Sequence, residues 1–288
     1  NSAMATIGGI IWLACAAAEA PDRRAVRWGI MGTGTIATDF VRVLHGLVDA
    51  EVVAVGSRTS ERAESFAAAL GIAGARGYGS YAELAADGQV DIIYIATPSS
   101  RHVPDSLLCL EAGKHVLCEK SMAPTAEEAS RVLSLARERG LFFLHGVWSR
   151  FFPAMRAIRQ AIDSGAIGTV CSAHASFCQA DGAGSCSAMA ETGIYCVQFL
   201  AWAFGGREAE VGGVCYELDP HTGHDTHVAA TLHFSGGGIG TLECSLRHPS
   251  PREAVICGTR GVIRVSFPFW CPTRFSIQRM SGPASQTW

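Results

Sequence analysis

The sequence predicts an α/β domain built on a doubly wound parallel sheet, followed by an α+β domain built on a mainly antiparallel open sheet. Two observations predict this. From Ala25 to about Val147, short and almost continuously apolar runs alternate with helical stretches, as in a parallel sheet covered on both faces. After Pro153, most β-type runs follow one another across short turns such as Ser235–Gly237, as in an antiparallel sheet. The length of 288 residues also fits two domains.

The first domain is expected over residues 25–148. A strand at Ala25–Met31 ends in a glycine turn, and a helix follows to about Leu47. Further strands are expected at Glu51–Gly56, Val90–Ala96, Lys114–Glu119 and Leu141–Val147, with helices at Glu61–Leu70, Ser106–Ala112 and Ala126–Arg139. The boundary with the second domain is expected near Val147–Phe152.

The second domain is expected over residues 149–288. It begins with a helix at Ala154–Ser164 and a strand at Thr169–Cys178, and a second helix covers roughly Ala190–Phe204. The remaining strands are expected at Ala209–Leu218, His227–Phe234, Gly238–Ser245, Glu253–Gly258 and Gly261–Phe267. An uncovered apolar face of this sheet would need a partner, so we expect a homodimer.

Residues 1–24 are expected to form an extension outside both domains. Asn1–Ala3, ahead of Met4, are typical of a cloning remnant, and the apolar stretch Ile7–Ala18 is too short for a membrane-spanning helix. Its length fits a signal peptide, although no Lys or Arg precedes it. The chain has eleven cysteines and no C-x-x-C pair, which favours a reducing compartment and therefore a cytoplasmic location. Export stays an alternative.

Composition excludes several classes of protein. The apolar fraction of 48% excludes a disordered chain. A net charge of −3 gives no field that would favour nucleic acid or an acidic membrane as a partner.

The glycine turn after the first strand indicates a dinucleotide. A G-x-G-x-x-A pattern gains meaning when it follows a strand and opens a helix, as it does here. In that setting the first glycine makes the turn, the second lets the backbone approach a pyrophosphate, and the helix N-terminus supplies free N–H groups. The domain is thus predicted to be a Rossmann domain whose phosphate-binding residues are Gly32, Thr33, Gly34, Thr35 and Ile36.

The end of the second strand favours NADP over NAD. An acid there would bind the 2′-hydroxyl of NAD, but the chain has Ser57, Arg58 and Thr59. A guanidinium and two hydroxyls suit a 2′-phosphate, and Arg62 lies one helical turn further on as a second donor.

Several motifs together resemble the glucose–fructose oxidoreductase/inositol dehydrogenase family. They are the glycine turn, Ala96–Pro98 with His102, and Ala112–Lys120. Within that family, Trp148–Pro153, Gly193–Phe199 and Phe269–Thr273 resemble the dimeric dihydrodiol dehydrogenases, also described as NADP-dependent D-xylose dehydrogenases. The resemblance implies a Rossmann domain, a dimerising sheet domain and a diol or aldose substrate. It adds the cofactor-binding residues Thr97, Pro98, His102, Glu119, Lys120, Trp148 and Arg150.

Alcohol oxidation also needs a group that handles the hydroxyl proton, and three residues are predicted for that role. Lys120 follows a strand, so it lies at the carboxyl edge of the sheet where ligands bind. Glu191 and Tyr195 are four residues apart and would share one face of a helix. The resemblance gives Lys120 and Tyr195 the catalytic role, with Glu191 where relatives have Asp.

Departures from the family pattern keep a second hypothesis open. Ser121 replaces the proline of the E-K-P motif, Gln179–Met189 lacks a glycine-rich approach to Glu191, and the chain stops at Trp288, where relatives continue. These features favour a catalytically impaired NADP-binding sensor or scaffold of the same fold.

No metal site is predicted. Cys171 and His174 would face opposite sides of the strand that also holds Cys178, which argues against one tetrahedral site. His221, His224 and His227 surround a predicted turn. A zinc-binding interaction protein is therefore only a third hypothesis.

Overall fold

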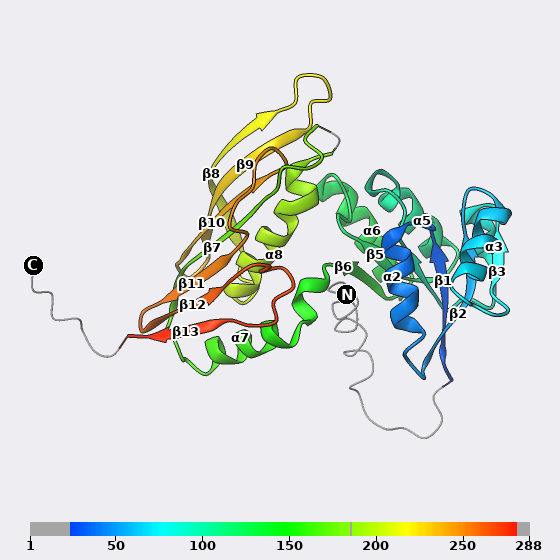
Figure 1. Cartoon of the computed structure of the whole chain (residues 1–288), viewed down its shortest axis with the longest axis horizontal. Helices are drawn as coiled ribbons and strands as arrows, with labels where there is room; N and C mark the ends of the chain where they lie inside the picture. Colours follow the sequence, from blue (N-terminus) through cyan, green and yellow to red (C-terminus); the bar gives the residue numbers. More distant parts are fainter. Residues whose placement is uncertain (1–23, 185, 281–288) are drawn as a thin grey trace, which may run out of the picture. The chain divides into compact units, whose positions relative to one another are not determined.

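The computed structural model describes residues 24–184 and 186–280 (Figure 1). The apolar stretch Ile7–Ala18, with the question of export, and the chain end at Trp288 lie outside the described residues. The chain divides into two compact units, one ending at Trp148 and the other beginning at Ser149. Within the described residues, none of the helices combines the length and apolar character that a membrane crossing requires.

The first unit holds a six-stranded, fully parallel sheet in the order β3-β2-β1-β4-β5-β6. This is the doubly wound dinucleotide-binding order, which reverses between β1 and β4 and leaves a crevice at their carboxyl ends. The strands are β1 Val26–Met31, β2 Ala50–Gly56, β3 Arg76–Tyr78, β4 Ile92–Ile95, β5 His115–Glu119 and β6 Phe143–Gly146. The predicted parallel sheet is confirmed.

Helices cover both faces of this sheet, because successive strand residues point to opposite sides. Ile30 and Tyr94 are buried with α2 and α3 on one face. Met31 and Ile93 are buried with α4, α5 and α6 on the other. The helices are α2 Thr35–Leu44, α3 Ser60–Ala69, α4 Tyr81–Ala86, α5 His102–Glu111 and α6 Ala126–Glu138, with a 3-10 turn η1 at Ser99–Arg101.

Hydroxyl caps fix where three of these helices begin. The side chains of Thr59, Ser80 and Thr125 accept hydrogen bonds from the backbone N–H three residues on, at 3.2–3.3 Å. The cap at Ser80 starts α4, which the sequence did not predict, and β3 was also missed. Three and six residues are too few for a periodic apolar pattern to stand out.

The second unit holds a seven-stranded sheet in the order β13-β12-β11-β7-β10-β9-β8. All neighbours are antiparallel except β7 and β10, which run parallel. The mainly antiparallel sheet is therefore confirmed, and β13 is an added edge strand. The strands are β7 Val170–Cys178, β8 Ala209–Leu218, β9 Asp225–Phe234, β10 Ile239–Ser245, β11 Ala254–Gly258, β12 Gly261–Val265 and β13 Ser276–Arg279.

One face of this sheet is covered by α8, Ile194–Ala203, which packs on β7 and β10. Phe177 of β7 stacks on Tyr195 of α8, so odd-numbered residues of β7 face the helix. Even-numbered residues, ending with Cys178, face the other side. The predicted helix over Ala190–Phe204 is present, but it begins with a π-helical turn, η3 at Met189–Gly193. The other helices are η2 Trp148–Phe151 and α7 Pro153–Asp163.

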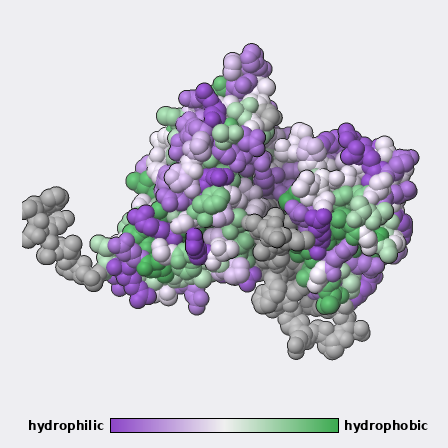
Figure 2. All heavy atoms as spheres, viewed as in Figure 1, coloured by the Kyte–Doolittle hydropathy of each residue, from purple (hydrophilic) through white to green (hydrophobic). Residues whose placement is uncertain are grey.

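Strand β8 lies at the open edge of the sheet, and all ten of its residues are exposed. They include the large apolar side chains Val211, Val214, Tyr216 and Leu218. Figure 2 shows the surface over β8 and β9 as a mixture of apolar and polar residues.

Candidate active site

A cavity of about 690 Å³ lies at the carboxyl ends of β1, β2 and β4, where the strand order reverses. That size is within the usual range for ligand pockets. Eight of the predicted cofactor-binding residues line it: Gly32, Thr33, Gly34, Ser57, Arg58, Arg62, Thr97 and Pro98. Thr35 and Ile36 follow directly in the first turn of α2.

The two glycines of the turn fit a dinucleotide in different ways. Gly32 has φ of +103°, and an added Cβ would lie 2.8 Å from the carbonyl oxygen of Ala96. Gly34 caps α2 with extended backbone, and an added Cβ would meet nothing within 4 Å. Gly32 is therefore required by the protein itself, whereas the space beside Gly34 is left for a ligand. The residues present thus fit the pyrophosphate of a dinucleotide.

Cationic and hydroxyl groups gather at the end of β2, as predicted for a 2′-phosphate. Arg58 and Arg62 both line the cavity. The Ser57 hydroxyl is buried and lies 3.3 Å from the Thr33 hydroxyl. Thr59 caps α3, since its side-chain oxygen accepts from the Arg62 N–H at 3.3 Å. One role of Thr59 is therefore to start the helix that carries Arg62.

Two further residues line the cavity that the sequence did not single out, Tyr81 and Arg101. Burial raises the pKa of Tyr81 and nearby Asp105 adds to the rise, while Arg101, Arg58 and Arg62 oppose it. Arg101 forms an ion pair with buried Asp105 at 2.6 Å. Arg101 follows the Thr97–Pro98 motif by three residues, which was an available signal, whereas Tyr81 belongs to the missed helix α4.

His102 lies buried rather than on the cavity wall. Only 1% of its surface is exposed, and its Nε2 and Nδ1 lie 2.8 and 2.7 Å from the carbonyl oxygens of Thr97 and Ser121. The imidazole therefore joins the segment after β4 to the segment after β5. Thr97 is held a second time, because its hydroxyl donates to Asp105 at 2.8 Å. These contacts give His102 a part in positioning Thr97, one of the predicted cofactor-binding residues.

Glu119 holds the backbone from which Lys120 projects. Its carboxylate accepts from the Tyr94 hydroxyl at 2.7 Å and from the Lys120 backbone N–H at 3.2 Å. Burial raises the pKa of Glu119, while these two hydrogen bonds oppose the rise. Lys120 is half-buried at the end of β5, and the Lys120–Ser121 peptide bond is cis. Lys120 thus lies at the carboxyl edge of the sheet, where the sequence placed it.

An aromatic wall surrounds Tyr195 in the second unit. Tyr195 is 6% exposed, and its ring lies 5.7 Å from that of Phe177 and 6.5 Å from that of Trp270. Phe177 and Trp270 stack at 4.0 Å, and the Arg252 guanidinium lies 5.7 Å from the Trp270 ring. The wall draws on β7, α8 and the segment after β12, so sequence spacing alone did not reveal it.

Glu191 differs from the prediction in its local structure. It lies in the π-helical turn η3 and is exposed, whereas Tyr195 is buried near the start of α8. In a π-helical turn the hydrogen bonds span five residues, so a spacing of four does not stack side chains as it does in an α-helix.

Trp148 and Arg150 lie in η2, the first half-buried and the second exposed. Lys120 belongs to the first unit and Tyr195 to the second, and their cooperation stays a prediction.

Cys171, His174, His221 and His224, which were considered for a metal, belong to no metal-binding cluster among the described residues. Cys171 is exposed, and the His174 Nδ1 lies 2.9 Å from the Thr241 hydroxyl. His221 and His224 lie in the turn between β8 and β9. Cys178 is buried at the end of β7.

Comparison with known families matches both units. Residues 26–147 match the description "Oxidoreductase family, NAD-binding Rossmann fold", and residues 155–264 match the "GFO/IDH/MocA C-terminal domain".

Individual proteins match over most of the chain. The chain is 40% identical over 263 residues to trans-1,2-dihydrobenzene-1,2-diol dehydrogenase of Mus musculus and 39% identical over 264 residues to that of Homo sapiens. Each alignment covers 88% of this chain and 78% of the relative. Among solved structures, KijD10, a 3-ketoreductase from Actinomadura kijaniata in complex with TDP-benzene and NADP, matches with a TM-score of 0.80 and 25% identity. That match covers 90% of this chain and 82% of the other.

Proposed function

Because this chain belongs to the Gfo/Idh/MocA oxidoreductase family, we propose that it is an NADP-dependent dehydrogenase acting on a CH–OH group of a small diol or aldose. The observation that carries the proposal is the cavity at the glycine turn, with open space beside Gly34 and with Arg58 and Arg62 on its wall. When bound, the cofactor supplies a nicotinamide that accepts or returns a hydride. Two observations support the substrate class. The relatives are named as dehydrogenases of a diol, and the structural neighbour KijD10 is named as a 3-ketoreductase.

The chain's own residues supply binding and proton handling. We assign cofactor binding to residues 25–148, and substrate binding and dimerisation to residues 149–288. Tyr195 and Lys120 exchange the proton of the substrate hydroxyl, and Glu191 orients them. The aromatic wall of Phe177 and Trp270 excludes water from one side of Tyr195.

We expect NADP to bind at least about tenfold more tightly than NAD, which corresponds to about 1.4 kcal/mol. The reason is the Arg58 and Arg62 pair and the lack of an acid at the end of β2. Arg58→Ala should reduce the preference to near unity by weakening NADP alone, measured by quenching of tryptophan fluorescence. Arg42→Ala, which removes an exposed arginine of α2, is the matched control. Equal affinities in the native protein would contradict the proposal.

A homodimer formed through the sheet of the second unit is the second expectation. The exposed apolar residues of β8 have no cover within the described chain, and burying them would stabilise an assembly. Light scattering should give twice the chain mass at micromolar concentration. Val214→Asp with Tyr216→Asp should shift the mass toward the monomer, whereas Val48→Asp, at an exposed valine of the first unit, should not. A native monomer would contradict this proposal.

A second candidate function is a cofactor-binding sensor or scaffold with little turnover. It is favoured by the exposed Glu191 in the π-helical turn, at a position where the family resemblance implies Asp. A panel of diols and aldoses assayed with NADP separates the two, because only the enzyme turns over. We also propose a cytoplasmic location, supported by the absence of disulfides among the described cysteines.

A further inference from the structure

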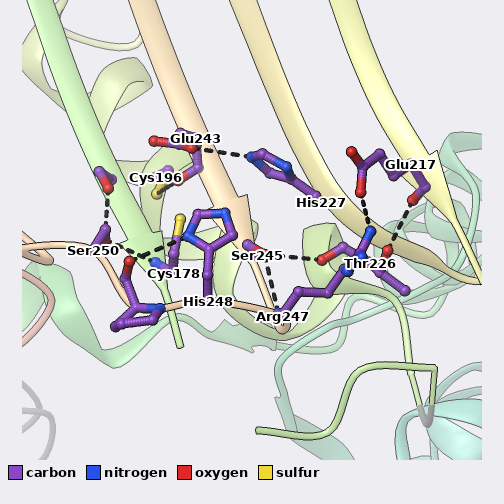
Figure 3. Close-up of polar contacts among 12 residues, drawn as sticks. Cys178, Cys196, Glu217, Thr226, His227, Glu243, Ser245, Arg247, His248 and Ser250 are labelled. Atoms are coloured by element: carbon purple, nitrogen blue, oxygen red, sulfur yellow. Dashed lines mark hydrogen bonds and ion pairs between the residues drawn. The ribbon is translucent and has the colours of Figure 1, made fainter. Parts of the chain in front are cut away.

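Three side chains with metal-binding atoms meet on the sheet face opposite α8. Cys178 ends β7, Glu243 lies on β10, and His248 lies in the loop that follows β10. The Cys178 sulfur, a Glu243 carboxylate oxygen and a His248 ring nitrogen all lie within 4.8 Å of one another. In Figure 3 the His248 ring points toward the Cys178 sulfur.

The sheet register explains why two of these residues meet. Ser245 of β10 pairs with Cys178 of β7 and with His227 of β9, so all three residues face the same side. Glu243 lies two residues before Ser245 and therefore faces that side as well. Alternate residues face the helix-covered side, as Cys244 shows, because a Cβ added to Gly193, just before α8, would lie 2.8 Å from the Cys244 sulfur.

Hydrogen bonds hold the loop that carries His248 over the sheet. The Cys178 N–H donates to the Ser250 hydroxyl at 3.1 Å, and the Ser250 N–H donates to the Cys178 carbonyl at 3.1 Å. The Ser176 hydroxyl lies 2.7 Å from that of Ser250. Arg247 is fixed on the other side of His248, since it forms an ion pair with Glu217 and its N–H donates to Ser245. His248 therefore lies between two residues, Arg247 and Ser250, that are held in place by these contacts.

His227 supports Glu243 from the neighbouring strand. Its Nε2 lies 3.0 Å from the Glu243 Oε1, and its ring lies 4.8 Å from that of His248 in an edge-to-face arrangement. An imidazole beside a carboxylate is a frequent pair in metal sites, where one group binds the ion and the other orients it.

We propose that Cys178, Glu243 and His248 bind one Zn²⁺ ion, with His227 orienting Glu243. Zinc takes thiolate, imidazole and carboxylate ligands in tetrahedral sites, whereas Ca²⁺ and Mg²⁺ take oxygen ligands. Binding replaces the proton of the Cys178 thiol, which passes to solvent. Three protein ligands leave the fourth position to water.

Closing the site requires only side-chain movement. Zinc–ligand bonds of about 2.0–2.3 Å place tetrahedral ligands roughly 3.5 Å apart. The present separations of up to 4.8 Å therefore shorten by about an ångström. Glu243 and His248 are both partly exposed, so rotation of their side chains can supply that shift.

The site is separate from the proposed catalytic residues of the same unit. Tyr195 contacts Phe177 on the helix-covered face, while Cys178 faces the other side. The proposal therefore stands whether or not the chain turns over a diol or sugar.

The test titrates the whole, metal-stripped chain with Zn²⁺ by calorimetry and with Co²⁺ by absorption. We expect one ion per chain and a thiolate-to-cobalt charge-transfer band. Cys178→Ser and His248→Ala should each weaken Zn²⁺ binding at least about 100-fold. His227→Ala should weaken it about 10–100-fold while the stoichiometry stays at one, as expected for an orienting residue.

The matched control is Cys171→Ser with His174→Ala, which removes a cysteine and a histidine from the same strand. It should bind Zn²⁺ as the native chain does. The proposal is overturned if the native chain binds no Zn²⁺, or if His248→Ala binds it as tightly as the native chain. His248 lies in a loop, so that variant decides the question even if Cys178→Ser does not fold.

Discussion

Replacing Tyr195 by Phe should lower kcat about 10²–10⁴-fold on the best diol or aldose substrate while leaving NADP affinity nearly unchanged. That range is the usual contribution of general acid–base catalysis, and the substitution removes only the phenolic hydroxyl. The ring that stacks on Phe177 and faces Trp270 is retained, so packing should be preserved. Steady-state turnover and fluorescence titration of the cofactor give the two measurements.

Lys120→Met extends the same test to the other unit. If the two residues act together on one proton, Lys120→Met should lower kcat at least as much as Tyr195→Phe does. The kcat of the double variant should then be only slightly below that of either single variant. Independent roles would instead give losses that multiply. Near-normal turnover of Tyr195→Phe would make Tyr195 a packing residue and overturn the assignment.

Gly34→Ala should weaken NADP binding strongly without destabilising the protein. Its Cβ meets no protein atom within 4 Å, so the free protein accommodates it. The methyl would occupy space proposed for the pyrophosphate, and each charge-assisted hydrogen bond lost there costs about 1.5–3 kcal/mol, or roughly 10–10²-fold in affinity. Cofactor titration should therefore show weaker NADP binding, while thermal unfolding should show an unchanged melting temperature.

Gly32→Ala is the matched comparison, because it strains the protein itself. Its φ of +103° and the approach of 2.8 Å to the Ala96 oxygen leave no room for a side chain. Backbone strain of this kind costs about 1–3 kcal/mol, so the melting temperature should fall along with cofactor affinity. If Gly34→Ala binds NADP normally, the cofactor does not cross the turn as we propose.

Much of the fold was predictable because burial leaves a pattern in the sequence. Strands such as Ile92–Ile95 are buried on both faces and therefore read as unbroken apolar runs. The glycine turn could be placed because its residue types follow from backbone geometry. The three-residue β3 and the π-helical turn η3 left no such pattern, since neither spans enough residues to set a period.

From residue patterns alone, the candidate site was predictable where its residues are close in the chain, and the family resemblance added the distant Thr97 and Pro98. Arg58 and Arg62 follow one strand, and the sequence placed both at the cofactor. Tyr81 and Trp270 come from distant segments that only the fold brings into place. The proposed zinc ligands illustrate the same limit, because Cys171 and His174 are near Cys178 in the sequence, whereas Glu243 and His248 meet it only in the folded sheet.

The position of β7 in its sheet has a consequence for how the second unit folds. β7 is the first strand of that sheet in the chain, yet it lies between β10 and β11. His174 and Thr241, which meet across β7 and β10, are 67 positions apart in the sequence. The hairpins β8–β9–β10 and β11–β12 can close locally, but β7 must wait for both, and contacts so distant in sequence slow folding. During synthesis β7 leaves the ribosome long before either neighbour, with both of its edges open to pairing with other chains.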